Sequence, residues 1–596
     1  MAHRLRVLFL TTVVAAQTGA PAGARSELAV SDGPTPEACA ALGFQVQPTA
    51  DSYAAPRHFG GVAASQVYPA PLAPPPPAAP IARSKAEVQE LVVTGGRIGG
   101  KARAEPRRVV APVYQAYPSQ PMDTERYPNA QANPIKRVAD DPVSTFSVDV
   151  DTAAYSNVRR FLQDGQRPPS DAVRVEELVN YFDYGYARPE DRATPFSSYV
   201  ALAPSPWSGE RQILHVGIQG FDVPRAEAPP LNLVFLIDTS GSMMGPDRLP
   251  LAQKSLSLLI EQLRPQDRVA MVAYAGSAGA VLAPTDGRQK LKMRCALGVL
   301  QAGGSTAGGQ GLALAYALAR QNYDPKAVNR VILVTDGDFN VGIADPSKLK
   351  DFVSDQRKSG VYLSVYGYGR GNYNDTMMQA LAQNGNGTAA YVDSLQEARK
   401  LFRTDFTKSL FPIADDVKIQ IEFNPAQVSE YRMIGYETRL LNREDFNNDQ
   451  VDAGEVGAGA SVTALYEITP AGAKGSSDPL RYGRAAPATG GGGELAFLKI
   501  RYKLPGQAKS QLIQRPITQA QLSPTLRAAP EPTQWAVAVA GFGQKLKRDP
   551  RVSDAFGWND ILSLAQSGRG ADPYGERAEF VQLVRLAGGA WAAGEN

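Results

Sequence analysis

The middle of the chain alternates between two hydrophobic patterns. Short, nearly continuous apolar runs are typical of parallel strands buried on both faces of a sheet, and the segments between them carry apolar residues at helical spacing. The predicted strands cover residues 231–237, 269–274, 331–338 and 361–367. The predicted helices cover residues 249–263, 288–300, 307–321 and 346–359. This alternation predicts a doubly wound α/β domain with a mostly parallel sheet, whose ligands bind outside the carboxyl ends of the strands.

The two flanks of this domain show other patterns. Strand patterns precede it at 145–150 and 213–218, and helical patterns at 153–163 and 173–182. Alternating segments follow it at 417–423, 462–468 and 495–502, and helical ones at 534–546 and 558–586. We therefore expect an antiparallel β-rich unit and a C-terminal helical segment. Packing of the β-rich unit against the strands near residues 146 and 213 is one possible arrangement.

A length of 596 residues allows about four domains. We expect a signal peptide at 1–24, a linker rich in proline and alanine at 25–140, an N-terminal extension at 141–228, the α/β domain at 229–411, a β-rich domain at 412–510 and a helical segment at 511–596.

The N-terminus has the pattern of a secretory signal. Arg4 and Arg6 precede an apolar run from Val7 to Ala16, and small residues that suit a signal peptidase follow. The run is short for a membrane span of about 20 residues, so an uncleaved anchor is the weaker alternative. No later stretch is apolar enough to cross a bilayer. We predict export to the periplasm or cell envelope, with no membrane span after the signal.

The segment 25–140 is rich in alanine, proline, serine and glycine. It offers too little apolar surface to offset its ordering entropy, so we expect a disordered, partly polyproline linker. One β-prone island, residues 88–97, resembles the TonB box of outer-membrane receptors. A TonB-like contact would form by strand addition, and the alternative is an isolated β-prone patch in a flexible tail.

Composition narrows the chemistry further. Lys and Arg number 62 against 59 Asp and Glu, and a net charge of +3 is too balanced to suggest nucleic acid as a main partner. Of three histidines only His215 falls in a predicted domain, where we expect a strand residue with a hydrogen-bonded ring. Two cysteines, Cys39 and Cys295, are too few for a cysteine-rich metal site or a disulfide scaffold. A metal site must therefore use oxygen ligands, as Mg²⁺, Mn²⁺ and Ca²⁺ do.

Five oxygen-bearing residues stand in or near the segments that follow the predicted strands. They are Asp238, Ser240, Ser242, Thr306 and Asp336. Because the carboxyl ends of parallel strands meet at one edge, we expect these two carboxylates and three hydroxyls to lie together and to suit Mg²⁺. The alternative is a set of helix N-caps, since Ser, Thr and Asp commonly precede helices.

This set resembles the metal-ion-dependent adhesion site (MIDAS) of von Willebrand factor type A (VWA) domains at all five positions. The matching pattern is Asp238-x-Ser240-x-Ser242, Thr306 and Asp336. The resemblance implies a Rossmann-like VWA fold, in which the three hydroxyls contact the metal and the two carboxylates hold it directly or through water. It also implies an open coordination position that a partner's carboxylate commonly fills.

The resemblance extends beyond the VWA domain. Residues 146–153, 180–184, 435–437 and 462–467 are similar to the N- and C-terminal regions of a bacterial VWA subfamily often labelled calcium-activated chloride channel homologues. We do not carry the channel label over, because a chain with no membrane span after its signal cannot conduct ions by itself.

Acidic residues elsewhere are weaker candidates for metal binding. Asp338 is a loop residue that lines the site in one interpretation. Asp149 and Asp151 share a strand face, where solvated carboxylates are expected rather than cation ligands. Residues 445–449 have calcium-loop spacing, but the glycine and glutamate that complete such a loop are missing, so a solvated hairpin is expected.

The main hypothesis is an exported, non-enzymatic binding module. It would hold one divalent cation and use it to capture an acidic group on a protein partner in the cell envelope. The first alternative is a metal-dependent hydrolase, because the same carboxylates could activate water, although no histidine base, cysteine nucleophile or nucleophile elbow lies near them. The second alternative is an envelope scaffold in which the metal is purely structural.

Overall fold

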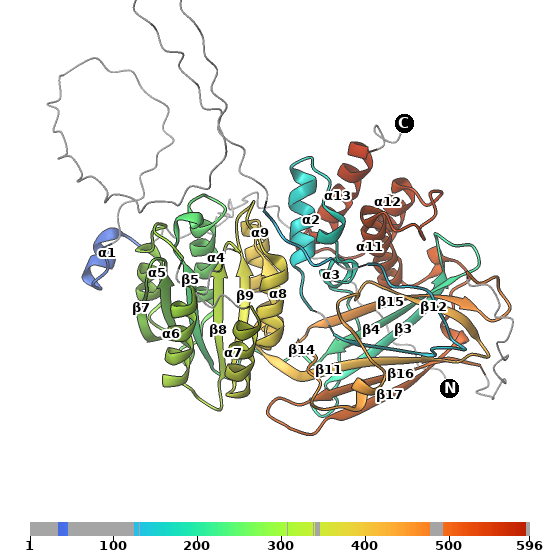
Figure 1. Ribbon diagram of the computed structural model, residues 1–596, viewed down its shortest axis with the longest axis horizontal. Coiled ribbons are helices and arrows are strands. Elements are labelled where there is room, and N and C mark those ends of the chain that lie inside the picture. Colours follow the sequence, from blue (N-terminus) through green and yellow to red (C-terminus); the bar gives the residue numbers. More distant parts are fainter. Residues whose placement is uncertain are drawn as a thin grey trace, which may run out of the picture. The chain divides into compact units, whose positions relative to one another are not determined.

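The computed structural model describes residues 34–45, 124–129, 131–148, 150–306, 308–337, 339, 346–476 and 493–591. The signal peptide expected at 1–24 and the TonB-box-like segment at 88–97 lie outside these ranges. By their contacts, the described residues belong to one unit. It contains a central α/β domain, a β unit and a group of helices (Figure 1).

A six-stranded sheet forms the centre of the α/β domain. Its strands are β5 (Leu231–Asp238), β6 (Arg268–Tyr274), β7 (Ala278–Asp286), β8 (Val328–Thr335), β9 (Val361–Gly367) and β10 (Ala389–Tyr391). Their order is β10-β9-β8-β5-β6-β7, and only the pair β6–β7 is antiparallel. The chain reverses its direction of winding between β5 and β8. Their carboxyl ends therefore form the switch point at which α/β sheets bind ligands.

Helices cover both faces of this sheet. They are α4 (Leu249–Gln262), α5 (Lys290–Gly298), α6 (Gly308–Gln321), α7 (Pro346–Lys358) and α8 (Asp375–Asn384). Alternate residues of β5 divide between two cores. Leu233 and Phe235 pack with α4 and α5, whereas Leu236 packs with α6, α7 and α8. The doubly wound fold predicted from the apolar runs is confirmed.

The β unit contains two antiparallel sheets built from strands on both sides of the central domain. One has the order β1-β12-β15-β4-β3, and the other β13-β2-β11-β16-β17 with β14 paired to β11. The strands before the central domain are β1 (Lys136–Arg137), β2 (Val143–Ser147), β3 (Phe196–Pro204) and β4 (Gln212–Gly220). Those after it are β11 (Pro412–Phe423), β12 (Val428–Ile434), β13 (Leu440–Leu441), β14 (Gly454–Gly457), β15 (Ser461–Pro470), β16 (Glu494–Lys503) and β17 (Gln511–Thr518).

Pairing of strands far apart in sequence closes the β unit. Phe146 of β2 lies opposite Ile419 of β11, and β4 pairs along its length with β15. The two sheets pack face to face, since Phe423 of β11 stacks on Tyr431 of β12 with ring centroids 4.3 Å apart. The C-terminal strands thus join those near residues 146 and 213, and the β-rich unit is not formed by residues 412–510 alone.

A group of helices packs on the sheet that contains β4 and β15. It comprises α2 (Ala153–Gln163), α3 (Val175–Asn180), α11 (Glu531–Lys547), α12 (Trp558–Ser567) and α13 (Glu576–Trp591), which share a core with Ile213 and Leu465 (Figure 1). The helical pattern at 558–586 corresponds to two helices, because α12 ends at Ser567 and α13 begins at Glu576. Arg159 of α2 ties the group to the central domain through ion pairs with Asp393 at 2.5 Å and Glu397 at 2.8 Å.

His215 has the structural role predicted for it. The ring is fully buried on β4, with Nε2 2.7 Å from the hydroxyl of Tyr186 and Nδ1 3.0 Å from that of Thr533 on α11. Burial lowers the pKa of the ring to about 3. The side chain is therefore neutral and joins the sheet to the helical group.

The N-terminal region departs from prediction in three places. A disulfide joins Cys39 in the short helix α1 (Pro36–Ala41) to Cys295 of α5, a bridge that was not predicted. Disorder was expected throughout 25–140, which is wrong for residues 34–45, where α1 lies, and for the part from 124 onward, which includes β1. Within the described ranges, every helix is too short or too polar to span a bilayer.

Candidate metal centre

Asp238 is oriented at the carboxyl end of β5 by groups on both neighbouring strands. It is fully buried, and its Oδ1 accepts a hydrogen bond from the backbone N–H of Ser240 at 2.8 Å. Its Oδ2 accepts from the hydroxyl of Tyr274 on β6 at 2.9 Å and from that of Thr335 on β8 at 3.3 Å. The carboxylate position is therefore fixed by the sheet itself.

The turn after Asp238 brings two hydroxyls together. Residues Gly241–Met243 form a 3-10 turn, η2, and the Oγ atoms of Ser240 and Ser242 lie 2.9 Å apart. Ser240 is buried, whereas Ser242 is partly exposed. Neighbouring oxygen ligands of an octahedral Mg²⁺, each about 2.1 Å from the ion, are about 3 Å apart. The separation of the two hydroxyls therefore fits a shared cation.

The loop that carries Thr306 is hydrogen-bonded to the same turn. The backbone N–H of Gly241 donates to the carbonyl of Gly304 at 2.9 Å, and that of Gly303 donates to the carbonyl of Thr239 at 2.8 Å. Gly304 has a φ of +85°, a conformation that favours glycine. Thr306 follows two residues later and is half-buried. The structure thus places the Thr306 loop beside η2.

Asp336 lies at the same edge of the sheet. It is fully buried and directly follows β8, in which Val334 lies opposite Ile237 of β5. The next residue, Gly337, has a φ of +104°, and a Cβ there would lie 2.6 Å from the backbone nitrogen of Asn374. Only glycine fits, so the turn after β8 packs directly against the loop that precedes α8.

Arg248 also lies at this edge of the sheet, although the sequence did not predict it as a site residue. Its Nη1 lies 3.9 Å from Oδ2 of Asp336 and donates to the carbonyl of Ser242, while Nη2 donates to the carbonyl of Arg370 at 2.5 Å. One guanidinium thus joins the first turn, the Asp336 turn and the loop before α8. No sequence signal marks it, because an arginine before a helix is common on protein surfaces.

The electrostatics of the edge favour a cation. Burial raises the pKa of Asp238 to about 6, and the negative charge of Asp336 adds to this rise. The hydrogen bonds from Ser240 lower the pKa but do not cancel the effect of burial. Two buried carboxylates that repel each other are stabilised by a positive ion between them. Their oxygens and the serine hydroxyls are the ligands that hard divalent cations prefer. The residues present therefore fit the metal that the MIDAS resemblance implies.

The loop before α8 is held from outside by the N-terminal region. Residues 124–126 pair through their backbone with residues 371–375, at distances of 2.8 to 3.0 Å. Both terminal nitrogens of Arg160 on α2 donate to the carboxylate of Glu125 at 2.7 Å. Arg174, which directly precedes α3, forms an ion pair at 2.6 Å with Asp375, the first residue of α8. One wall of the candidate site is thus also a contact with the N-terminal region.

The other acidic candidates that the structure describes do not form metal sites. Asp149 and Asp338 lie outside the described residues. Asp151 is neither solvated nor a cation ligand, because it is buried and pairs with Arg439 at 3.1 Å. At 445–449, the carboxylate of Asp449 pairs with Arg501 at 3.0 Å. In the part of the chain that the structure describes, no three His, Cys, Asp or Glu side chains converge to hold a metal. The MIDAS-like set has only two carboxylates, so a cation held there would also need its hydroxyls as ligands.

Comparison with known proteins assigns the chain to a family. A family model described as von Willebrand factor type A domain matches residues 232–404, and one described as von Willebrand factor matches residues 121–215. A third, described as the C-terminal part of uncharacterized protein YfbK, matches residues 408–589. Uncharacterized protein YfbK of Escherichia coli (strain K12) is 47% identical over 474 residues, which cover 78% of this chain and 81% of that protein. The chain belongs to the YfbK family of VWA-domain proteins. The narrower assignment, to the subfamily often labelled calcium-activated chloride channel homologues, stays a prediction.

Solved VWA structures show likeness of fold at low identity. A von Willebrand factor type A protein from Catenulispora acidiphila is 18% identical, covers 68% of this chain and 91% of its own, and has a TM-score of 0.38. Proximal thread matrix protein 1 from the mussel byssus, solved with a zinc-occupied MIDAS motif, is 22% identical and covers 30% of this chain and 45% of its own, with a TM-score of 0.25. At these scores neither supports an argument about the site of the present YfbK-family chain.

Proposed function

We propose that this YfbK-family chain is an exported, non-enzymatic module that captures an acidic group of a protein partner through a divalent cation. The ligands would be Asp238, Ser240, Ser242, Thr306 and Asp336. The observation that supports this most is the meeting of two buried carboxylates with a hydroxyl pair 2.9 Å apart at the switch point of the sheet. Mg²⁺ suits this donor set best, with Mn²⁺ and Ca²⁺ as alternatives.

The surrounding residues explain how such a site would select an acid. When bound, the cation supplies an electrophilic position that favours an anionic oxygen, since the hydroxyl ligands are neutral. Tyr274 and Thr335 keep Asp238 in a fixed orientation. Arg248, whose side chain is 21% exposed, adds a positive charge at the rim. Together these groups attract a carboxylate from solution and orient it.

Two features support export. The basic and apolar N-terminus has the pattern of a secretory signal. The Cys39–Cys295 disulfide is a bond that persists in oxidising compartments such as the periplasm and is rare in the cytosol. Peptide mapping under non-reducing conditions of the protein taken from a cell-envelope fraction tests this proposal. Free thiols at both positions would contradict it.

The chemistry of the edge gives little support to the hydrolase alternative. His215 is buried on β4 in hydrogen bonds with Tyr186 and Thr533, and both cysteines are in the disulfide. A general base would have to be one of the carboxylates that hold the metal. Activity that survives Ser240→Ala but not Asp238→Ala would favour hydrolysis.

The decisive experiment compares cation binding with partner binding. Asp238→Ala and Thr306→Ala should abolish cation binding measured by titration calorimetry and cation-dependent crosslinking to envelope proteins, with the circular dichroism spectrum unchanged. Asp355→Ala is the matched control, since Asp355 is exposed and pairs only with Lys358 among the ion pairs of the described residues.

Two results would contradict the proposal. If either site variant retains full partner binding, the cation does not mediate capture. If EDTA lowers the melting temperature but leaves crosslinking unchanged, the metal is structural and the scaffold alternative holds.

A further inference from the structure

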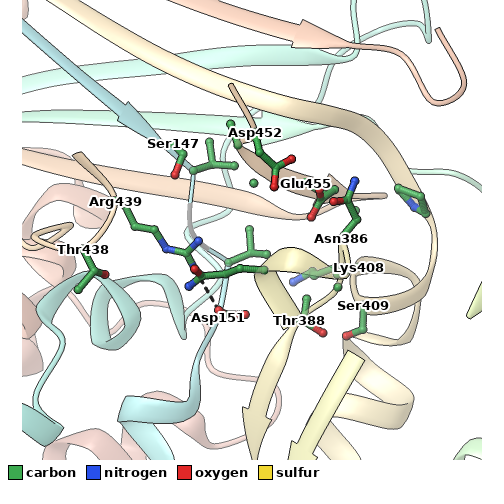
Figure 2. Close-up of a pocket in the computed structure, with 18 of the residues that line it drawn as sticks. Ser147, Asp151, Asn386, Thr388, Lys408, Ser409, Thr438, Arg439, Asp452 and Glu455 are labelled. Carbon is green, nitrogen blue, oxygen red and sulfur yellow. Dashed lines mark hydrogen bonds and ion pairs between the residues drawn. The ribbon is translucent and has the colours of Figure 1, made fainter. Parts of the chain in front are cut away.

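A second candidate site lies at the other end of β8 from the metal centre. It is a cavity of about 220 Å³ between the central domain and the β unit (Figure 2). Arg330, near the start of β8, and the loop after α8 contribute one side, and residues from β2 and β14 contribute the other. Because Asp336 follows the far end of the same strand, this cavity is separate from the MIDAS-like site.

Glu455 of β14 places a carboxylate without a partner against the cavity. Its Oε1 is buried and has no hydrogen-bond partner among the residues that the structure describes. Figure 2 shows Glu455 and Asp452 together on one side, with Arg439 and Asp151 on another. Burial raises the pKa of Glu455 well above its usual range, and the charges of Asp415 and Asp452 add to the rise. The positive charge of Arg357 opposes this rise, but among the described residues no cation forms an ion pair with the Glu455 carboxylate.

Arg330 places the opposite charge in the same cavity. The residue is 3% exposed, and its Nη1 donates to the hydroxyl of Ser364 at 2.6 Å. Its Nε is buried and finds no acceptor in the described part of the chain. It forms no ion pair with a carboxylate of the described residues, although its guanidinium lies over the ring of Tyr362 at 5.4 Å. Burial lowers the pKa of Arg330, and neighbouring groups, including Glu455, oppose that shift. A buried guanidinium without a carboxylate is costly.

The other charged side chains of the cavity already have partners. Arg439 pairs with Asp151 at 3.1 Å, Lys408 with Asp405 at 3.0 Å, and Asp452 with Arg357. Arg330 and Glu455 thus remain as lining groups of opposite sign that form no ion pair with each other or with another residue that the structure describes. Unsatisfied buried polar groups in a folded protein call for an explanation, and a ligand that carries both charges would satisfy both.

We propose that this cavity binds a small zwitterion of amino-acid size, with its ammonium group at Glu455 and its carboxylate at Arg330. The volume equals that of about seven water molecules at about 30 Å³ each, which suits a ligand of that size. A metal ion fits less well, because no three acidic side chains of the described residues converge there. A singly charged amine or acid would leave one of the two buried groups unsatisfied.

Titration calorimetry on the full chain, in EDTA to exclude the MIDAS-like site, tests this proposal. The zwitterionic probes are glycine, L-alanine and β-alanine. The singly charged controls are ethylamine, which carries only the ammonium group, and propionate, which carries only the carboxylate. We expect saturable binding of at least one zwitterion. Glu455→Gln and Arg330→Lys should each weaken it at least about tenfold, as expected for the loss of a charged hydrogen bond.

The variants separate binding from folding. Glu455→Gln is isosteric and mimics the protonated side chain, so the melting temperature should stay unchanged. Glu422→Gln on β11 is the matched control, because that carboxylate pairs with Lys499 with 47% of its side chain exposed, and it should bind like wild type. Equal binding of ethylamine and the zwitterion, or unchanged binding by Glu455→Gln, would overturn the proposal. Absence of binding by every probe would show a water-filled cavity and overturn it as well.

Discussion

His215 makes the folded chain sensitive to acid in a way that one substitution should remove. Its ring is buried, with both nitrogens within 3.0 Å of the hydroxyls of Tyr186 and Thr533. Burial lowers the pKa of the ring from 6.5 to about 3. The unfolded chain therefore binds a proton at this position at a higher pH than the folded chain does.

The sign and size of the effect follow from linkage. Stability rises with pH wherever the unfolded state binds more protons, so protonation of His215 destabilises the fold as pH falls from 6.5 towards 3. Each pH unit in that window costs about 1.4 kcal/mol. At a pH of about 4.5 the accumulated loss is about 3 kcal/mol. Above pH 6.5 this group contributes no pH dependence.

His215→Gln isolates this contribution, because glutamine can hydrogen-bond but cannot titrate. Its neighbours keep other partners, since Tyr186 also contacts Thr463 at 2.8 Å and Thr533 contacts Tyr199 at 3.0 Å. Urea unfolding, followed by tryptophan fluorescence from about pH 7 to 4.5, should show a loss about 3 kcal/mol larger in the wild type. If the free energy of unfolding fell equally with pH in the two proteins, the conclusion that the His215 ring is buried and neutral would be wrong.

The MIDAS-like edge and the disulfide give two further expected outcomes. Arg248→Gln should raise Mg²⁺ affinity about fivefold by calorimetry, because a partly exposed guanidinium 3.9 Å from Asp336 is worth about 1 kcal/mol and competes with the cation. The same variant should weaken capture of an acidic partner, and a fall in Mg²⁺ affinity would contradict this account. Cys39→Ser should lower the free energy of unfolding by about 2–4 kcal/mol and expose residues 34–45 to limited proteolysis. Unchanged stability and protection would show that α1 is held without the bridge.

The central domain could be predicted because its strands are buried on both faces. Every residue of β5 and of β8 is buried, which produces the continuous apolar runs seen in the sequence. β7 was not predicted, because it lies at the edge of the sheet and most of its residues are exposed or half-buried. Burial on both faces therefore explains why β5 and β8 could be predicted, and exposure at the sheet edge explains why β7 was missed.

The arrangement of the β unit could not be derived from local patterns. Segments that correspond to β2, β4, β11, β15 and β16 were predicted as strands, whereas β3, β12 and β17 were not. The pairing of β2 with β11 and of β4 with β15 joins residues separated by the whole central domain. Such pairing depends on complementary faces and register, which a single sequence does not display. The Cys39–Cys295 disulfide could not be derived from local patterns either, since 256 residues separate the two cysteines.

The same limit applies to the candidate site. Asp238, Ser240 and Ser242 are close in sequence, so their proximity follows from one turn, and Asp336 follows from the parallel register of β5 and β8. Arg248 and the loop before α8 could not be found in this way. They reach the edge through contacts between distant segments, such as the close approach of Gly337 to Asn374.

The insertion of the VWA domain between the two halves of the β unit gives the two ends of β8 different environments. At the carboxyl end, Ser242, Thr306 and Arg248 remain partly exposed, so a macromolecular acid can approach. At the amino end, the β unit covers Arg330 and leaves only a small cavity. The proposed protein partner would therefore reach the first end, and the proposed small molecule the second. This difference arises from the topology of the chain, because an isolated VWA domain would expose both ends of the strand.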